Sequence, residues 1–157
     1  MSPSCCRAFF VVGGVGALLT FAIAAHAQQP LPDGPGKEVV ERVCGACHDL
    51  DTVTGARRTR ADWRATVNAM IARGAITTDE EFVTIVDYLV RYVGLVNVNK
   101  AAAPEIEAVL GITSNDAIEI VRYRSDHGDF DDLDGLKKVP GIDATVLEER
   151  KDRVAFR

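Results

Sequence analysis

Hydrophobic and polar positions divide the chain into three stretches of different character. Residues 8–25 form an uncharged apolar run, whereas from residue 36 onward apolar side chains recur every three or four positions, the period of an amphipathic helix. After residue 94 the periodic segments become shorter and are separated by turns that contain glycine or proline. The pattern predicts an all-α protein in three parts: a leader at 1–27, a first unit at 28–95 and a second unit at 96–157.

Three helices are predicted in the first unit. The earliest covers 37–43, and the last begins at Thr78, where Glu81 completes the sequence of a capping box. The middle helix carries one apolar face, made of Trp63, Val67, Met70 and Ile71. The face of the last helix consists of Phe82, Ile85, Val86, Leu89 and Val90. Both faces predict a small buried core.

The second unit contains an internal repeat. A helix opened by Pro104 is interrupted at Gly111, and the same arrangement returns at Gly141, 30 positions later. Ser114 is expected to cap the helix after the first interruption, and residues 125–132 are expected to form a turn. A short helix near 133–136 and a last helix from 144 toward 154 complete the prediction of two helix, glycine turn, helix elements.

The leader has the plan of a secretory signal peptide. Arg7 precedes the apolar run, and Ala25 and Ala27 provide an A-x-A cleavage site. Cleavage after Ala27 would place the protein in the periplasm or otherwise outside the cytoplasm and would remove Cys5 and Cys6. The alternative is a retained membrane anchor, because about 18 apolar residues just span a bilayer.

Composition adds little until the charges are divided between the units. The 157 residues include 18 Lys and Arg against 23 Asp and Glu, a formal charge of −5. The first unit has 8 basic and 10 acidic side chains, and the second has 9 against 13. A chain of this balance has no overall attraction to nucleic acid or anionic lipid, so such binding would need a local basic patch.

Residues 44–48 read Cys-Gly-Ala-Cys-His, which is the pattern of covalent haem attachment. Cys44 and Cys47 can each form a thioether to a haem vinyl group, and His48 then lies beneath the iron as its proximal ligand. A thioredoxin-like thiol pair is the first alternative, although no βαβ pattern surrounds it. A zinc site is the second, although the ligand spacing is unusual. The pattern predicts one covalently attached haem c.

The second iron ligand follows by elimination. Met70 is the only methionine after the leader, and His127 is the only other histidine there, in a predicted loop. Met70 and Trp63 share the helix face that would cover the haem, so Met70 is the expected distal ligand, with an open iron site as the alternative. Arg57 and Arg58 belong to a basic run that either pairs with haem propionates or forms a solvated loop.

With these motifs, residues 36–94 resemble a small monohaem cytochrome c of the class I kind. The resemblance implies an electron-transfer protein rather than an enzyme, with redox protein partners that include membrane-associated ones and with no small-molecule substrate. One departure is the distance from His48 to Met70, 22 positions, which is shorter than usual for that family.

The second unit resembles the tandem helix-hairpin-helix domain of competence-type DNA-binding proteins. The resemblance covers 96–156 and rests on the Val-Asn-Val-Asn segment at 96–99 and on the paired Gly-Ile turns. A related fold also serves as a protein-docking module in an extrinsic photosystem subunit. In the DNA-binding members a second glycine and lysines follow the turn, whereas this chain has Thr113 and Asp143 at the glycine positions. The acidic balance therefore favours a docking role over DNA, although five basic residues could form one local face: Lys137, Lys138, Arg150, Lys151 and Arg153.

The sequence alone thus predicts an exported electron carrier whose hairpin unit docks it to a protein partner. The alternative is an exported DNA-binding helix-hairpin-helix protein whose haem is structural or senses redox state.

Overall fold

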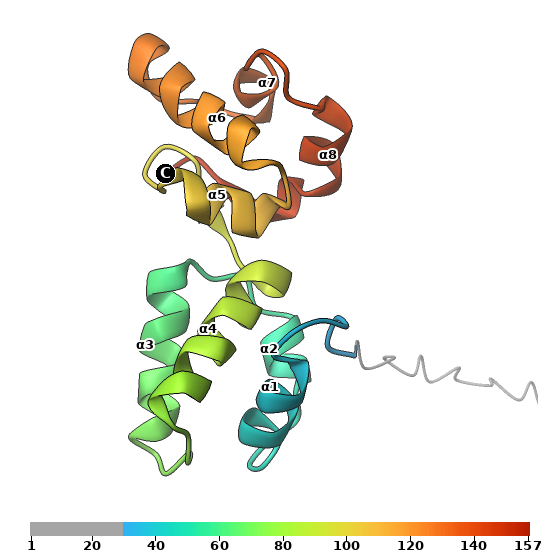
Figure 1. Ribbon diagram of the computed structural model, residues 1–157, viewed down its shortest axis with the longest axis vertical. Coiled ribbons are helices and arrows are strands. Elements are labelled where there is room, and N and C mark those ends of the chain that lie inside the picture. Colours follow the sequence, from blue (N-terminus) through green and yellow to red (C-terminus); the bar gives the residue numbers. More distant parts are fainter. Residues whose placement is uncertain (1–29) are drawn as a thin grey trace, which may run out of the picture.

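The computed structural model describes residues 30–157, so the predicted leader and its cleavage site lie outside the described residues. The chain is mostly helical, and its helices form two units, one below the other in Figure 1. No helix within residues 30–157 is both long and apolar enough to cross a membrane.

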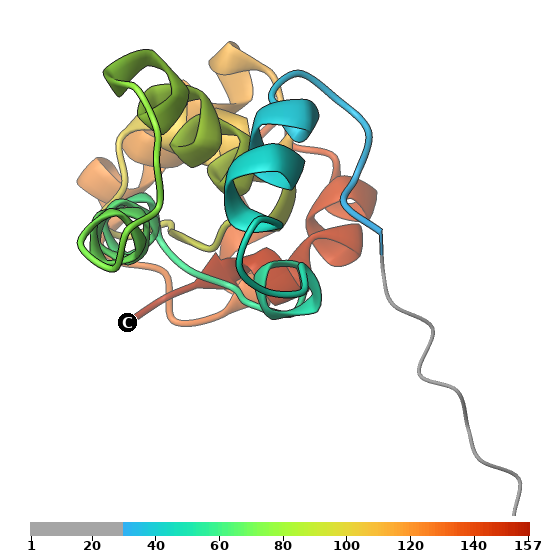
Figure 2. The same cartoon turned by 90° about the horizontal axis from the view of Figure 1, so that it is seen from below.

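The first unit consists of four helices: α1 (Lys37–Cys44), α2 (Asp51–Thr54), α3 (Arg60–Ile71) and α4 (Asp79–Val93). Both α1 and α3 pack on α4, and Figure 2 shows α1 and α3 on different sides of the unit. The capping box at Thr78 is confirmed, because its side chain accepts a hydrogen bond from the Glu81 N–H and the Glu81 carboxylate accepts one from the Thr78 N–H. The apolar face of α4 is buried as its periodicity predicted, with Ile85 fully enclosed.

The second unit contains α5 (Ala103–Leu110), α6 (Ser114–His127), α7 (Leu133–Leu136), α8 (Ala144–Glu149) and the 3₁₀ turn η1 (Lys151–Arg153). Hairpin 1 is the turn at 110–113, between α5 and α6, and hairpin 2 is the turn at 140–143, between α7 and α8. Leu110, Ile120, Leu136 and Leu147 are completely buried, so one core is shared by both hairpins.

Four details of the second unit differ from the prediction. Thr113, rather than Ser114, is the N-cap of α6, because its hydroxyl accepts the Asp116 N–H. The helix continues to His127, which is therefore not a loop residue. The last helix ends at Glu149 instead of continuing toward residue 154. Finally, β1 (Val96–Asn97) and β2 (Val154–Ala155) pair in parallel, so the described chain is not purely α-helical. Two-residue strands carry too short a pattern to be found by periodicity.

The motif at 96–99 has a structural role that its sequence did not explain. The side-chain amide of Asn99 donates to the carbonyl oxygens of Phe130 and Phe156, at 2.8 and 2.9 Å. Its side-chain oxygen accepts the Phe130 N–H at 2.9 Å. One asparagine thus holds three segments of the second unit together, because the three backbone groups find their partner in its side chain.

The two units are joined by a buried arginine. Arg153 is 4% exposed, and its guanidinium donates to three carbonyl oxygens at the end of α4, those of Val90, Arg91 and Gly94, at 2.8 to 3.0 Å. Carbonyls at a helix C-terminus lack partners within the helix and carry a partial negative charge. A guanidinium there supplies hydrogen-bond donors to these carbonyls and a positive charge that interacts favourably with the helix dipole. The pKa of Arg153 falls to about 10, chiefly because burial disfavours its charge.

Candidate functional site

An apolar pocket of about 370 Å³ occupies the first unit beside the Cys-Gly-Ala-Cys-His segment. Its walls come from α1, α2, α3 and α4, and they include both cysteines. Cys44 is half-buried and Cys47 is exposed, and neither forms a disulfide. Burial raises the pKa of the Cys44 thiol, which keeps it protonated at neutral pH. A reactive redox pair requires the opposite shift, so the environment disfavours the thioredoxin-like alternative.

The predicted ligand side chains lie around the same pocket. His48 and Met70 both line it, from the loop after α1 and from the end of α3. The Nδ1 atom of His48 lies 3.0 Å from the Asp49 carbonyl oxygen, an interaction that orients the ring and leaves Nε2 free. Within residues 30–157 no group of three His, Cys, Asp or Glu side chains is arranged to hold a metal ion, which gives the zinc alternative no support.

Trp63 lies against the pocket with an unusual polar atom. The side chain is 3% exposed, and its Nε1 has no hydrogen-bond partner among the described residues. Buried donors nearly always have an acceptor, so an N–H without one at the wall of an apolar pocket is suited to a polar group of a bound ligand. This orphaned donor could not be found from the sequence, because only the fold shows which atoms are enclosed.

Of the two arginines predicted near the pocket, Arg57 and Arg58, only Arg58 lines it. Arg58 lines the pocket, with its guanidinium carbon 5.7 Å from the centre of the Trp63 ring. Arg57 points elsewhere and forms an ion pair with Asp152 of the second unit, Nε to Oδ2 at 3.3 Å. Adjacent residues in this extended segment face opposite ways, which explains why only one of them reaches the pocket.

Hairpin 1 presents an open backbone turn. Gly111 has φ +66°, a left-handed conformation that disfavours any residue with a Cβ, and a Cβ built there would meet no atom within 4 Å. The Ile112 N–H has no acceptor among residues 30–157. Thr113, at the second glycine position, forms a capping box with Asp116. The threonine therefore serves the helix end, and the turn keeps its shape without a second glycine.

A second cavity, of about 530 Å³, lies beside hairpin 1 where the two units meet. We call it the arginine notch, and it is defined by Arg91, Glu107, Gly111, Ile112, Arg150 and Arg153. Arg91 and Arg150 are exposed, and neither forms an ion pair with any residue in the described range. The sequence analysis missed Arg91, since it belongs to α4, far from the hairpins along the chain, and no spacing rule connects the two.

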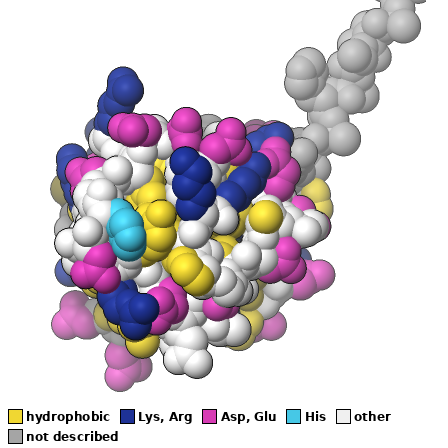
Figure 3. Space-filling model, turned by 90° about the horizontal axis from the view of Figure 1, so that it is seen from above, with side chains coloured by type: hydrophobic (Ala, Val, Ile, Leu, Met, Phe, Trp, Pro, Cys, Tyr) yellow, Lys and Arg dark blue, Asp and Glu magenta, His cyan; other side chains and the backbone are white. Residues whose placement is uncertain are grey.

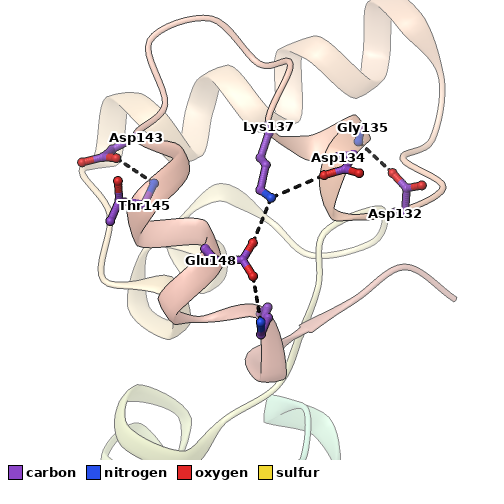
Figure 4. A network of polar contacts seen from close by, with 8 residues as sticks. Asp132, Asp134, Gly135, Lys137, Asp143, Thr145 and Glu148 are labelled. Carbon is purple, nitrogen blue, oxygen red and sulfur yellow. Dashed lines mark hydrogen bonds and ion pairs between the residues drawn. The ribbon is translucent and has the colours of Figure 1, made fainter.

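Hairpin 2 has a different electrostatic environment (Figure 4). Lys137 forms ion pairs with Glu148 at 2.8 Å and with Asp134 at 3.4 Å, and Lys151 pairs with Glu148 at 2.7 Å. These two lysines lower the pKa of Glu148 to about 2, mainly through their hydrogen bonds. Asp143 caps α8 by accepting the Thr145 N–H at 2.8 Å, so its carboxylate lies where an anion would have to approach.

The predicted single basic face is therefore wrong. Lys137 and Lys151 both pair with Glu148, Lys137 pairs with Asp134 as well, and Arg153 is buried under the end of α4. Figure 3, which looks onto the second unit from above, shows acidic and basic side chains intermixed around hydrophobic patches. On this face, positive charge is not concentrated.

Comparison with known proteins identifies the second unit. The model of a family described as a helix-hairpin-helix motif matches residues 92–155. An uncharacterized protein of Haemophilus influenzae is 43% identical over 61 residues, which are 38% of this chain and 54% of that protein. ComE operon protein 1 of Bacillus subtilis is 30% identical over 63 residues, 40% of this chain and 31% of that protein. The second unit therefore carries a helix-hairpin-helix domain, as its glycine turns predicted.

A third relative has an enzyme in its name. Endonuclease/exonuclease/phosphatase family domain-containing protein 1 of Danio rerio is 40% identical over 62 residues, but these are 10% of its length. The match falls on the hairpin region and gives no ground for nuclease activity in this chain. The chain thus spans about half the length of the Haemophilus protein and far less of the others. No solved structure matches.

These findings correct the functional interpretation. The matches support the helix-hairpin-helix domain, whereas nothing in them supports a cytochrome c domain. The description of this chain as an electron-transfer protein docked to a redox partner is therefore wrong. The acidic balance of the second unit was counted over all its residues, whereas binding of an anion depends on where the unpaired charges lie.

Proposed function

We propose that the protein binds duplex DNA through its helix-hairpin-helix unit. The observation that carries the proposal is the family match over 92–155, which includes both glycine turns and the segments that support them. Contacts to the phosphate backbone supply most sequence-independent affinity, and backbone N–H groups and arginines are suitable donors. Hairpin 1 offers both kinds of donor side by side, with the free Ile112 N–H next to Arg91 and Arg150.

The direct test is fluorescence anisotropy of a labelled duplex titrated with the full chain at several salt concentrations. We expect an affinity that falls steeply as salt rises, because each phosphate neutralised releases condensed counterions. Bovine serum albumin, another acidic protein, serves as the control for nonspecific adsorption. Absence of binding at about 50 mM salt, where electrostatic association is strong, would refute the proposal.

We propose further that the pocket in the first unit holds one covalently attached haem c with a structural or redox-sensing role. When bound, this group supplies an iron that changes between ferrous and ferric states. Cys44 and Cys47 would attach it, and His48 and Met70 would face it from two walls of the pocket. The orphaned Trp63 Nε1 and the guanidinium of Arg58 are donors suited to its carboxylates. The apolar walls and this unused donor fit such a group.

Intact mass spectrometry tests attachment directly. Protein produced in cells that attach haem should gain the mass of one haem, and the double variant Cys44→Ser, Cys47→Ser should not gain it. Met70→Ala should keep the covalent haem and lose the sulfur-to-iron charge-transfer band of the oxidised form. A wild-type mass equal to that of the bare polypeptide would exclude the cofactor, without affecting the DNA proposal.

The Ala25 and Ala27 site supports a location outside the cytoplasm, and we include this in the proposal. Sequencing the N-terminus of the protein isolated from its native cells tests it. A first residue of Gln28 is expected, and an intact leader would contradict cleavage.

A further inference from the structure

The positive charges that the hairpin turns lack are supplied from elsewhere in the molecule. No lysine comes directly after either glycine turn in the sequence, and the lysines near hairpin 2 form ion pairs with Glu148. At hairpin 1, by contrast, two arginines line the same cavity as the turn: Arg91 of α4 in the first unit, and Arg150 at the end of α8 in the second.

The two arginines are free to accept an anion. Both are exposed, and neither donates to a carboxylate or a carbonyl anywhere in residues 30–157. Arg153 also lines the notch, but its guanidinium already donates hydrogen bonds to the carbonyls at the end of α4. Arg153 therefore adds positive charge to the notch, while the guanidinium groups of Arg91 and Arg150 keep their donors for an anion. The positive charge of Arg150 helps to depress the pKa of Arg153, which is the electrostatic effect expected of a cationic cluster.

One carboxylate also lines the notch. Glu107 accepts a hydrogen bond from the Ser114 hydroxyl at 2.8 Å, which holds it against the start of α6. It opposes anion binding, so the net charge of the three arginines and this glutamate remains positive. The open side of Gly111 leaves room for an anion to reach the Ile112 N–H, since nothing lies within 4 Å of the position of a Cβ.

We propose that the arginine notch seats a phosphate of the DNA backbone, held by Arg91 and Arg150 beside the open turn of hairpin 1. The proposal rests on the DNA-binding function given above and refines it in two ways. Hairpin 1, and not hairpin 2, anchors the duplex, and the first unit contributes directly to binding through Arg91.

The experiment compares charge-matched variants of the full chain in the anisotropy assay. Arg91→Gln and Arg150→Gln should each weaken binding by about tenfold at low salt and lower the salt slope by about 1, the values expected for loss of one phosphate contact. Arg122→Gln removes the same charge from α6, where the arginine pairs with Glu119, and should change the affinity less than about twofold. Circular dichroism melting curves check that each variant folds.

The outcomes separate the two levels of the proposal. If the wild type binds DNA and the notch variants bind equally well, the notch is not the seat and DNA binding stands. If the wild type does not bind DNA at low salt, both proposals fail.

A further arm distinguishes backbone phosphate from a small anion. Inorganic phosphate at millimolar concentration is added to the wild type and to Arg150→Gln. The proposal is supported if phosphate only weakly competes with the duplex. A clear rise in the melting temperature of the wild type with inorganic phosphate, together with no DNA binding, would assign the notch to a free anion and overturn the proposal.

Discussion

The two hairpins share a left-handed glycine turn and differ in their electrostatics. Gly111 and Gly141 have φ values of +66° and +82°, and an added Cβ would be in open space at both. Hairpin 1 borders two arginines without carboxylate partners in the described chain, whereas the lysines near hairpin 2 are paired with Glu148. Glycine preserves the duplicated turn, while residues from other elements decide which copy has unpaired positive charge beside it.

The largest expected effect concerns Arg153, the buried arginine that joins the two units, compared with an exposed lysine near hairpin 2. Arg153→Ala should lower the free energy of unfolding by about 3 kcal/mol, because three buried carbonyls lose a charged donor. Lys137→Ala, which removes two surface ion pairs near hairpin 2, should lower the free energy of unfolding far less. Urea unfolding followed by circular dichroism measures both. Equal losses would show that the buried arginine contributes no more than a surface pair.

A second prediction separates stability from binding at the glycines. Gly111→Ala and Gly141→Ala should each cost about 1 kcal/mol, since both residues would carry a Cβ into a left-handed conformation. DNA affinity should fall for Gly111→Ala alone, because only that turn faces the arginine notch. Thermal melts and anisotropy titrations of the same two samples give both quantities. If both variants bind DNA equally weakly, the hairpins share the contact and the comparison is wrong.

The smallest expected effect comes from releasing the lysines of hairpin 2. Glu148→Gln should free Lys151, leave Lys137 paired with Asp134 alone, and raise DNA affinity a few-fold at low salt. Glu149→Gln is the matched control, because it removes the same charge from a neighbouring residue that forms no ion pair in the described range. An identical gain in both variants would mean that net charge, rather than the release of these lysines, determines the effect.

The ion pairs of Glu148 also predict how the stability of the fold depends on pH. The pKa of this glutamate in the folded chain is about 2, below the ordinary value of 4.5, so its pairing stabilises the fold above pH 4.5. That contribution should be lost as the pH falls from about 5 toward 2. An NMR titration of the Glu148 side chain should show a midpoint well below that of an unpaired glutamate. A midpoint near 4.5 would show that the ion pairs do not persist in solution.

Periodicity and turn chemistry predicted most of the helices. The face of α4, its capping box and the two glycine turns are local features, so the sequence indicates them directly. The pairing of β1 with β2 is not local, because it joins segments from opposite ends of the second unit. Helix ends were also misplaced where two capping residues compete, as at Thr113 and Ser114.

The candidate sites were predictable to different degrees. Cys44, Cys47, His48, Trp63 and Met70 line one pocket. Whether they hold haem stays a prediction. The arginine notch was beyond sequence reasoning, since it depends on the packing of α4 against α5 and on which arginines remain unpaired. Summed charge conceals such a site, because lysines bound to Glu148 count the same as arginines with no partner.

The contact of Arg153 with α4 also determines when the first unit is complete during synthesis. Arg153 follows Val90 by 63 residues, so α4 leaves the ribosome long before the side chain that covers its final carbonyls. Until then, water must satisfy those carbonyls, and the last turn of α4 is free to fray. A nascent chain stopped before residue 153 should therefore be more easily cleaved by protease near residues 90–94 than the finished chain.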